Sequence, residues 1–362
     1  MISAIERLQQ ALFTGEKAGK ADAALVTSEE NRFYLTGFPS SAGSVLLFRE
    51  EAYFLTDFRY AEAARRVVRG CQVVCIKKMN DTLKELLQKH GARSVLAESE
   101  RLSLKQARAF EKAFGEAGIA VTADDTLDET LTSLRMIKTP EEIQKLREAQ
   151  KITDDAFTHI LDYIKPGRTE REVALELEFF MRRQGAEGVS FEFIVVSGTN
   201  GSLCHGVPSD KPIQAGEFVT MDTGALLHGY HADMTRTVAV GHVSDEQRHA
   251  YDMVLKAQLA AIAAAKPGVL CGDVDKAARD ILEAEYKGAF EHSTGHGVGV
   301  EIHEWPMFAA GNKTVARPGM VVTVEPGIYL EGKFGLRIED MVAITETGCE
   351  DLTHSPKELI IL

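Results

Sequence analysis

The chain has 362 residues, more than one hydrophobic core usually supports, so we expect two domains. Its hydrophobic fraction of 44% and charged fraction of 26% are ordinary for a globular protein. The net charge of −13 argues against nucleic-acid binding, which gathers lysine and arginine, and gives no support to binding at an anionic membrane.

The N-terminal segment and the cysteines indicate a cytoplasmic protein. Glu6 and Arg7 interrupt the apolar segment that a signal peptide needs, and no run of about 18 apolar residues predicts a membrane span. The five cysteines are odd in number and scattered, and no second pair follows Cys71 and Cys75, which argues against a zinc ribbon. We therefore expect a reduced protein of the cytoplasm.

Residues 1–128 alternate short apolar runs with amphipathic segments. This order predicts a small N-terminal α/β domain with one mixed sheet. The polar stretch at 122–130 marks the boundary to a second domain, residues 129–362. The expected strands are 24–26, 45–48, 53–55, 72–76, 94–97 and 120–122. The expected helices are 57–68, 82–90 and 104–115, and the spacing of Ile2, Ile5, Leu8 and Leu12 is that of a further amphipathic helix.

The second domain carries an internal repeat. The tripeptide Lys-Pro-Gly occurs at 165–167 and again at 266–268, and each copy lies between two segments with helical periodicity. Each pair of helices is followed by an apolar hairpin with two acidic residues. We therefore expect an α+β domain of two halves related by a pseudo-twofold axis, with a site between them.

Four carboxylates in the two hairpins form the centre of the candidate site. The first hairpin carries Asp222 and Asp233 on either side of a turn at 228–229, and the second carries Glu325 and Glu339. If the two halves face each other, these carboxylates converge, repel one another and raise one another's pKa values. Two divalent cations would cancel the four charges.

His296, which lies between glycines, would add an imidazole nitrogen to these oxygen ligands. Such a set favours Mn²⁺, with Co²⁺, Fe²⁺ or Zn²⁺ as alternatives, and differs from the sulfur-rich sites of structural zinc. Two ions about 3.5–4 Å apart can hold a shared hydroxide, which is a strong nucleophile at neutral pH. His205 and His303 lie in glycine-containing segments and fit the same hydrolytic site.

The spacing alone leaves a second interpretation open. Asp222 and Asp233 could be exposed turn residues, and Glu339 and Asp340 could pair with Arg337. In that case the carboxylates would not converge, and the fold would need no metal.

Six motifs, in this order, resemble those of one metallopeptidase family. They are NGSLCHGVPSDK, MDTGA, HADMTRT, TGHGVGVEIHE, VEPGIY and GLRIED. The chain is thereby similar to prolidase, aminopeptidase P and methionine aminopeptidase, and FYLTGF and TDFRY resemble the N-terminal domain of the proline-specific members. The resemblance covers essentially the whole chain and implies the pita-bread fold, whose two related halves agree with the repeat.

The resemblance implies a metal-binding role for five positions. Asp222 would bind one metal ion, while His296 and Glu325 would bind the other. Asp233 and Glu339 would bridge both ions. The cofactors implied are therefore two divalent cations, of which Mn²⁺ suits the donor set best.

The resemblance also implies catalytic and substrate-binding roles. Glu325 would take a proton during attack on the scissile carbonyl, and His303 would stabilise the tetrahedral intermediate. His205 would contact the substrate near the leaving prolyl nitrogen, and Arg337 would orient ligand carboxylates. One departure from the family pattern is Cys204, where relatives often have proline.

The function implied is metal-dependent cleavage of the bond before proline in small peptides, by a homodimer. Methionine aminopeptidase shares the ligands but usually lacks an N-terminal domain of this size. Creatinase shares the fold without the ligands, and an inactive pita-bread binding module would have lost some of them. The intact set therefore favours an Xaa-Pro peptidase over these alternatives.

A dipeptidase must recognise the free carboxylate of its C-terminal proline, which arginine does best. After the HEWP motif no cation follows until Lys313 and Arg317, which argues against a strict dipeptidase. Arg32 and Arg59 of the N-terminal domain, from the same or a second subunit, are further candidates. Dipeptidase and aminopeptidase P activity therefore both stay open.

Overall fold

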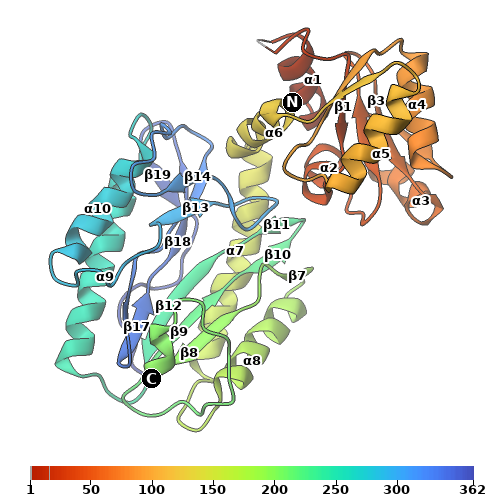
Figure 1. Ribbon diagram of the computed structural model, residues 1–362. Helices are drawn as coiled ribbons and strands as arrows, with labels where there is room; N and C mark the ends of the chain where they lie inside the picture. The colour runs from red at the N-terminus through yellow and green to blue at the C-terminus, as the bar shows by residue number, and fades with distance from the viewer. Residues whose placement is uncertain (1, 16) are drawn as a thin grey trace. The chain divides into compact units, whose positions relative to one another are not determined.

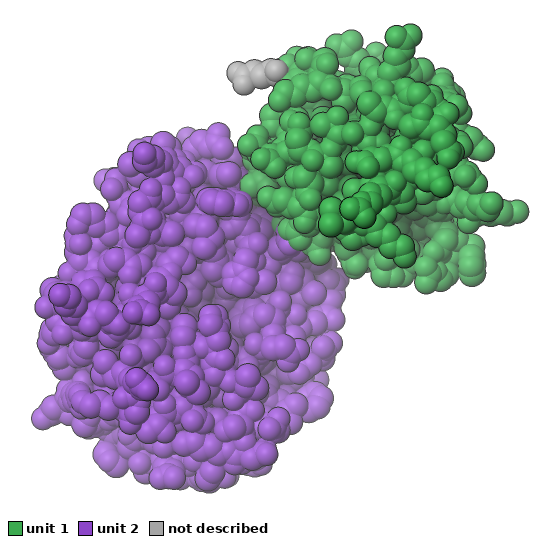
Figure 2. Space-filling model, in the orientation of Figure 1, with its two compact units in different colours: residues 1–135 green, residues 136–362 purple. Residues whose placement is uncertain are grey.

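The computed structural model describes residues 2–15 and 17–362, shown in Figure 1. The chain forms two compact units, residues 1–135 and 136–362 (Figure 2). The boundary expected at 128/129 falls within helix α6 (Asp125–Met136), and as a domain boundary it stays a prediction. None of the helices in the described part of the chain combines the length and hydropathy that a membrane crossing requires.

Unit 1 contains one six-stranded sheet in the order β4-β3-β2-β1-β5-β6. Strand β2 pairs antiparallel with β1 and β3, whereas the outer pairs are parallel, so the sheet is mixed as predicted. The strands are β1 (Ala23–Val26), β2 (Ser44–Leu47), β3 (Ala52–Thr56), β4 (Gln72–Cys75), β5 (Ser94–Ala97) and β6 (Ala120–Thr122).

Within the described residues of unit 1, five helices precede α6. One of them, α2, lies in a stretch for which the sequence predicted no helix. It is short and ends at Gly37, whose φ of 65° suits glycine at a helix C-terminus. The five are α1 (Ala4–Phe13), α2 (Glu29–Thr36), α3 (Phe58–Val67), α4 (Met79–Lys89) and α5 (Leu104–Gly115).

Unit 2 contains the same order of elements twice: two helices, then antiparallel strands. Gly167 and Gly268 end the two Lys-Pro-Gly turns with φ values of 92° and 87°, a conformation that glycine adopts at low cost. The first half has α7 (Pro140–Leu161), α8 (Glu170–Arg183), β7 (Gly188–Val189), β8 (Ile194–Ser197), the 3₁₀ helix η1 (Gly198–Ser202), β9 (Phe218–Thr223), β10 (Ala225–Leu227), β11 (Tyr230–His231) and β12 (Met234–Ala239).

The second half repeats this order around a five-stranded sheet, β14-β13-β15-β18-β19. Figure 1 shows the helix pairs α7–α8 and α9–α10 on opposite sides of the strands of unit 2. The elements are α9 (Asp245–Ala264), α10 (Cys271–Glu283), β13 (Gly295–Gly297), β14 (Glu304–Phe308), β15 (Val321–Val324), β16 (Gly327–Leu330), β17 (Phe334–Arg337), β18 (Asp340–Ile344) and β19 (Cys349–Asp351).

Each half of unit 2 has its own hydrophobic core. Asp222 and Asp233 lie on the faces of their strands that point away from the core of the first half. Val219 and Met221 of β9 belong to the core of the first half, as does Met234 of β12. Because side chains alternate along a strand, Asp222 and Asp233 lie on the opposite face of these strands. The alternation therefore directs both carboxylates toward the second half.

Candidate functional site

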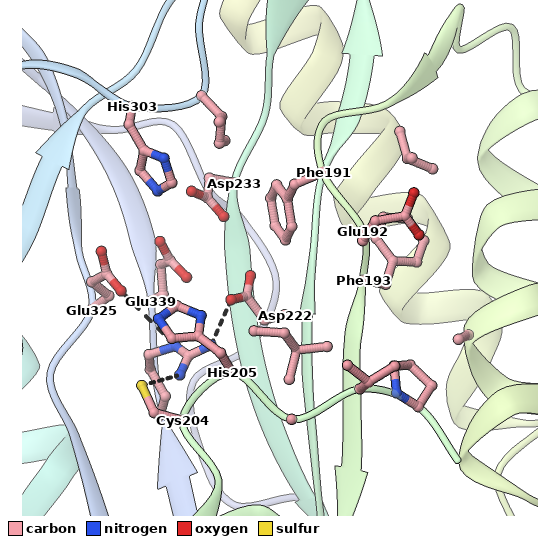
Figure 3. Close-up of a pocket in the computed structure, with 18 of the residues that line it drawn as sticks. Phe191, Glu192, Phe193, Cys204, His205, Asp222, Asp233, His303, Glu325 and Glu339 are labelled. Carbon is pink, nitrogen blue, oxygen red and sulfur yellow. Dashed lines mark hydrogen bonds and ion pairs between the residues drawn. The ribbon is translucent and has the colours of Figure 1, made fainter. Parts of the chain in front are cut away.

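A cavity of about 670 Å³ lies in unit 2 and is lined by residues of both halves. Figure 3 shows carboxylates from separate strands directed into one space, with Phe191 and Phe193 on the opposite wall. All eight residues singled out in the sequence line this cavity: His205, Asp222, Asp233, His296, His303, Glu325, Arg337 and Glu339.

The first hairpin brings its two aspartates together through a tight turn. Strand β12 pairs antiparallel with β9, so that Thr235 lies opposite Asp222. Strands β10 and β11 are joined by His228 and Gly229, whose φ values are 53° and 70°. Positive φ at both positions is typical of the two-residue turns that fit the twist of a hairpin. The turn predicted at 228–229 is therefore present.

The second hairpin places Glu325 directly after β15 and Glu339 directly before β18, strands that pair antiparallel. Hydrogen bonds then connect the two halves. The backbone N–H of Glu339 donates to the carbonyl of Thr235 at 3.1 Å, and the Thr235 hydroxyl donates to Glu339 Oε2 at 2.6 Å. These contacts fix the distance between the hairpins, and with it the spacing of the carboxylates.

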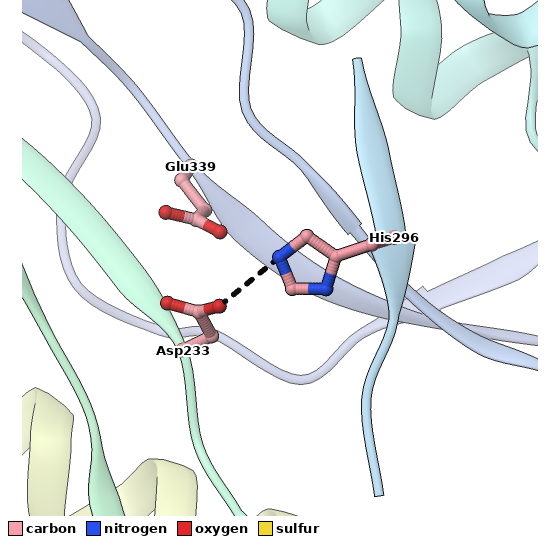
Figure 4. A group of neighbouring side chains, drawn as sticks. All are labelled: Asp233, His296 and Glu339. Carbon is pink, nitrogen blue, oxygen red and sulfur yellow. Dashed lines mark ion pairs between the residues drawn. The ribbon is translucent and has the colours of Figure 1, made fainter. Parts of the chain in front are cut away.

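Three buried side chains form the centre of the site (Figure 4). One side-chain nitrogen or oxygen atom from each of Asp233, His296 and Glu339 lies within 4.8 Å of the others, close enough for the three to hold a metal ion. His296 Nε2 is 3.5 Å from Asp233 Oδ2 and 3.4 Å from Glu325 Oε1. The backbone N–H of His296 donates to the Thr323 hydroxyl at 3.0 Å, which fixes the position of His296 on its strand.

Burial and crowding shift the pKa values of these groups toward their neutral forms. Burial, followed by the charge of Glu339, raises the pKa of Asp233 well above its ordinary value. The pKa of Glu339 is raised in the same way, by burial and then by Glu325. Burial raises the pKa of Glu325 to about 7, and burial lowers the pKa of His296. Without a cation, the folded protein therefore holds protons at carboxylates that are ionised in water.

The donor set fits a divalent cation. Asp222 Oδ1 and Glu339 Oε1 are buried and have no hydrogen-bond partner among the described residues. A buried carboxylate oxygen without a donor is costly, and a cation would satisfy both the oxygens and the charges. The arrangement of several carboxylates with one neutral imidazole is the type of set that Mn²⁺, Co²⁺ or Zn²⁺ accepts.

The alternative interpretation of the sequence is wrong in its ion pairs. Arg337 donates to Asp222 Oδ2 at 2.5 Å, whereas Asp340 pairs with Arg236 at 2.7 Å and with Lys357 at 2.5 Å. Asp233 is buried, so it is not an exposed turn residue either. The carboxylates converge as the first interpretation requires, and their roles as metal ligands stay a prediction.

His303 and His205 lie at the open side of the cavity. The ring of His303 packs edge-on against that of His296, with 4.4 Å between centroids and an interplanar angle of 70°. Partial burial, followed by the charge of His296, lowers the pKa of His303, which favours a neutral imidazole. His205 is exposed and follows Cys204, whose sulfur lies 3.9 Å from an Arg337 nitrogen.

Sequence reasoning gave no role to several residues that support Arg337. Its guanidinium donates to the Tyr329 hydroxyl at 2.7 Å and to the Thr235 hydroxyl at 2.9 Å. The Tyr329 hydroxyl in turn lies 3.0 Å from Nε2 of His292, a cavity-lining residue for which no function was expected. The motif VEPGIY contains Tyr329, but a tyrosine at the end of an apolar strand gives no separate signal.

The arginines suggested in the N-terminal domain are engaged within unit 1. Arg32 is buried and donates to the backbone carbonyls of Thr27 and Ser40. Arg59 pairs with Asp57 at the start of α3, at 2.6 Å. Both therefore have local structural partners.

Two family models together match most of the chain. The model described as Metallopeptidase family M24 matches residues 144–346, and that of the Creatinase/Prolidase N-terminal domain matches residues 5–137. A protein of Pyrococcus horikoshii named Xaa-Pro dipeptidase is 37% identical over 344 residues, which cover 94% of each chain.

Solved structures are similar over nearly the whole chain. An Xaa-Pro dipeptidase from Bacillus anthracis has a TM-score of 0.92, 43% identity and 99% coverage of both chains. An X-Pro aminopeptidase from Thermotoga maritima has a TM-score of 0.89, 37% identity and coverage of 95% of this chain and 98% of its own. These likenesses confirm the fold expected from the sequence, an α/β N-terminal domain followed by a pita-bread domain.

Proposed function

The chain belongs to metallopeptidase family M24, and from this premise we propose that it hydrolyses the peptide bond before proline in small peptides. The observation that carries this proposal is a convergence in one cavity of the candidate residues Asp222, Asp233, Glu325, Glu339, His205, His296 and His303. The names of its relatives, Xaa-Pro dipeptidase and X-Pro aminopeptidase, supply the substrate class.

We propose further that five residues hold two divalent cations, of which Mn²⁺ suits the donors best. Bound there, such cations would polarise the scissile carbonyl and make water a stronger nucleophile at neutral pH. Two observations support this assignment. Buried oxygens of Asp222 and Glu339 have no hydrogen-bond partner among the described residues, and the pKa values of Asp233 and Glu339 are raised. The five residues are Asp222, Asp233, His296, Glu325 and Glu339.

The chain's own side chains would move protons and position the substrate. Glu325, whose Oε1 lies 3.4 Å from His296 Nε2 at the centre of the site, would accept a proton from the attacking water and return it. His303, next to His296 at the open side of the cavity, would donate a hydrogen bond to the developing oxyanion. His205 would contact the leaving prolyl side, and Arg337 would hold Asp222 in its orientation.

The arginine side chains that line the cavity bear on whether dipeptides are the only substrates. Among the described residues that line it, Arg337 donates to Asp222 and Arg171 donates to Asp210 at 2.7 Å. A dipeptide's C-terminal carboxylate therefore meets no uncommitted arginine in this cavity. We propose that the enzyme also accepts Xaa-Pro-Yaa peptides. The homodimer and the cytoplasmic location expected from the sequence stay predictions.

The test is a comparison of substrates with purified protein in the presence of Mn²⁺ or Co²⁺. We expect release of the first residue from Ala-Pro and from Ala-Pro-Ala, and none from Ala-Ala, which lacks proline. Hydrolysis of neither proline-containing peptide would refute the proposal. Hydrolysis of Met-Ala-Ser instead would assign methionine aminopeptidase activity, and cleavage of Ala-Pro alone would restrict the enzyme to dipeptides.

A further inference from the structure

Lys138 is the one lysine among the fully buried charged residues in the described part of the chain. It directly precedes Thr139, the N-cap of α7, and its backbone N–H donates to the carbonyl of Gly319 at 2.8 Å. Its Nζ lies 3.1 Å from Glu304 Oε2, and the two side chains are 1% and 4% exposed. A buried ion pair of this kind is costly to form and more costly to break on one side only.

Glu304 is the neighbour of His303 in the chain and the first residue of β14. Residues 298–303 connect β13, which carries His296, to β14. The pairing of the two strands is irregular here, because Gly297 lies opposite Glu304 while His296 lies opposite Met307. The segment that carries His303 is therefore not held by regular ladder hydrogen bonds.

Contacts of the Glu304 carboxylate and a few backbone hydrogen bonds hold this segment instead. Glu304 Oε1 accepts a hydrogen bond from the backbone N–H of Glu301 at 3.0 Å, while Oε2 faces Lys138. The carbonyl of Gly299 accepts from the backbone N–H of His231 at 3.0 Å. A Cβ atom at Gly299 would lie 2.6 Å from Glu304 Oε2, so the carboxylate sits against the backbone of the loop.

We propose that Lys138 is a positioning residue that acts through Glu304 to place the imidazole of His303 in the cavity. Without the ammonium group, the buried Glu304 carboxylate would lose the charge that balances its own and would turn toward water. The loop closed by Glu304 would then shift, and His303 would move relative to the substrate carbonyl. This inference rests on the proposed function, because it takes His303 as a group that touches the substrate.

The test uses Lys138→Met, Lys138→Arg and an exposed control on α7, the helix that begins just after Lys138. Lys138→Met removes the charge and keeps the side-chain length. Lys138→Arg restores the charge. The control is Lys151→Met, which breaks a solvent-exposed pair with Asp155. We expect Lys138→Met to lower kcat for Ala-Pro about 10- to 100-fold with KM changed less than about twofold and metal content unchanged. Lys138→Arg should recover much of kcat, and Lys151→Met should match the wild type.

A mutant cycle with His303→Ala separates positioning from a general loss of structure. If Lys138 acts through His303, Lys138→Met should have little further effect on kcat in the His303→Ala background. An equal fold-loss in both backgrounds would overturn the proposal. If Lys138→Met does not fold, Lys138→Met/Glu304→Gln removes both charges, and full activity of that variant would equally overturn it.

Hydrogen exchange provides a readout that does not depend on activity. The amides of 298–304 should exchange faster in Lys138→Met than in the wild type, while exchange in α9 and α10 stays the same. Unchanged exchange in 298–304 would contradict the inference. If the wild type cleaves no proline-containing peptide, the proposed function fails, and the exchange result alone decides whether Lys138 holds the loop.

Discussion

Substitution of Glu325 by glutamine should stabilise the metal-free protein at alkaline pH. The carboxyl group has an ordinary pKa of 4.5, and burial raises its pKa in the folded chain to about 7. Because the folded pKa is the higher one, the group's contribution to stability is fully present below the unfolded pKa and is lost as the pH rises through about 7. Glutamine imitates the protonated acid and does not titrate.

The size of the effect follows from the shift. One pKa unit corresponds to about 1.4 kcal/mol, so ionisation of Glu325 costs the folded, metal-free protein about 3 kcal/mol at about pH 8. Near pH 4.5 the free energies of unfolding of the two proteins should be equal, apart from the small effect of the amide. Between about pH 5 and pH 8, the free energy of unfolding of the wild type should therefore fall progressively below that of Glu325→Gln.

The assay is urea unfolding in the presence of a chelator, followed by tryptophan fluorescence. Trp305 is the single tryptophan of the chain and lies two residues after His303, so its emission reports on unit 2. With added Mn²⁺ the wild type should become the more stable of the two proteins, because an ion that binds the folded wild type more tightly than the variant stabilises the wild type more. Parallel pH profiles for the two metal-free proteins would refute the reasoning that Glu325 is held protonated near neutral pH.

Two further predictions concern the surroundings of the carboxylates. Arg236→Met should destabilise unit 2 by about 3–5 kcal/mol, because the buried Arg236 donates to Asp340 and to the backbone carbonyl of Glu339. The control is Lys276→Met, which breaks a solvent-exposed ion pair with Asp280. Equal urea midpoints for the two variants would contradict this role of Arg236. Calorimetric titration should show that the affinity for Mn²⁺ rises between about pH 6 and pH 8, because carboxyl groups with raised pKa values must release protons to bind it. A pH-independent affinity would argue that these carboxylates are not ligands.

The sequence predicted the architecture well where patterns are local. The Lys-Pro-Gly repeat indicated the two halves. The apolar residues that alternate along β9 and β12 determine which face of each strand packs on the core, and hence where Asp222 and Asp233 lie. The turn at 228–229 was predictable because Gly229 lies between the two strands of the hairpin, and glycine adopts the positive φ of a tight hairpin turn at low cost. Helix α2 was not predicted, because its eight residues show only weak amphipathic spacing.

Pairings between distant segments were not predictable. Arg337, Glu339 and Asp340 are neighbours in the chain, and their order alone does not decide which carboxylate the arginine meets. The structure resolves it because Asp340 faces Arg236 and Lys357, while Arg337 reaches Asp222 from the other half. Lys138 lies 166 positions from Glu304, and a single lysine before a helix cap gives no sign of such a partner.

The central claim is that a metal held by these residues drives cleavage before proline. The most direct measurement is the rate of Ala-Pro hydrolysis by wild type and His296→Ala, each assayed with a chelator and with excess Mn²⁺, together with bound metal by mass spectrometry. The account predicts activity only for the metal-loaded wild type, and a folded His296→Ala with less bound metal and a kcat lowered by about 1000-fold or more. Hydrolysis that persists in chelator, or a near-normal kcat in His296→Ala, would contradict it.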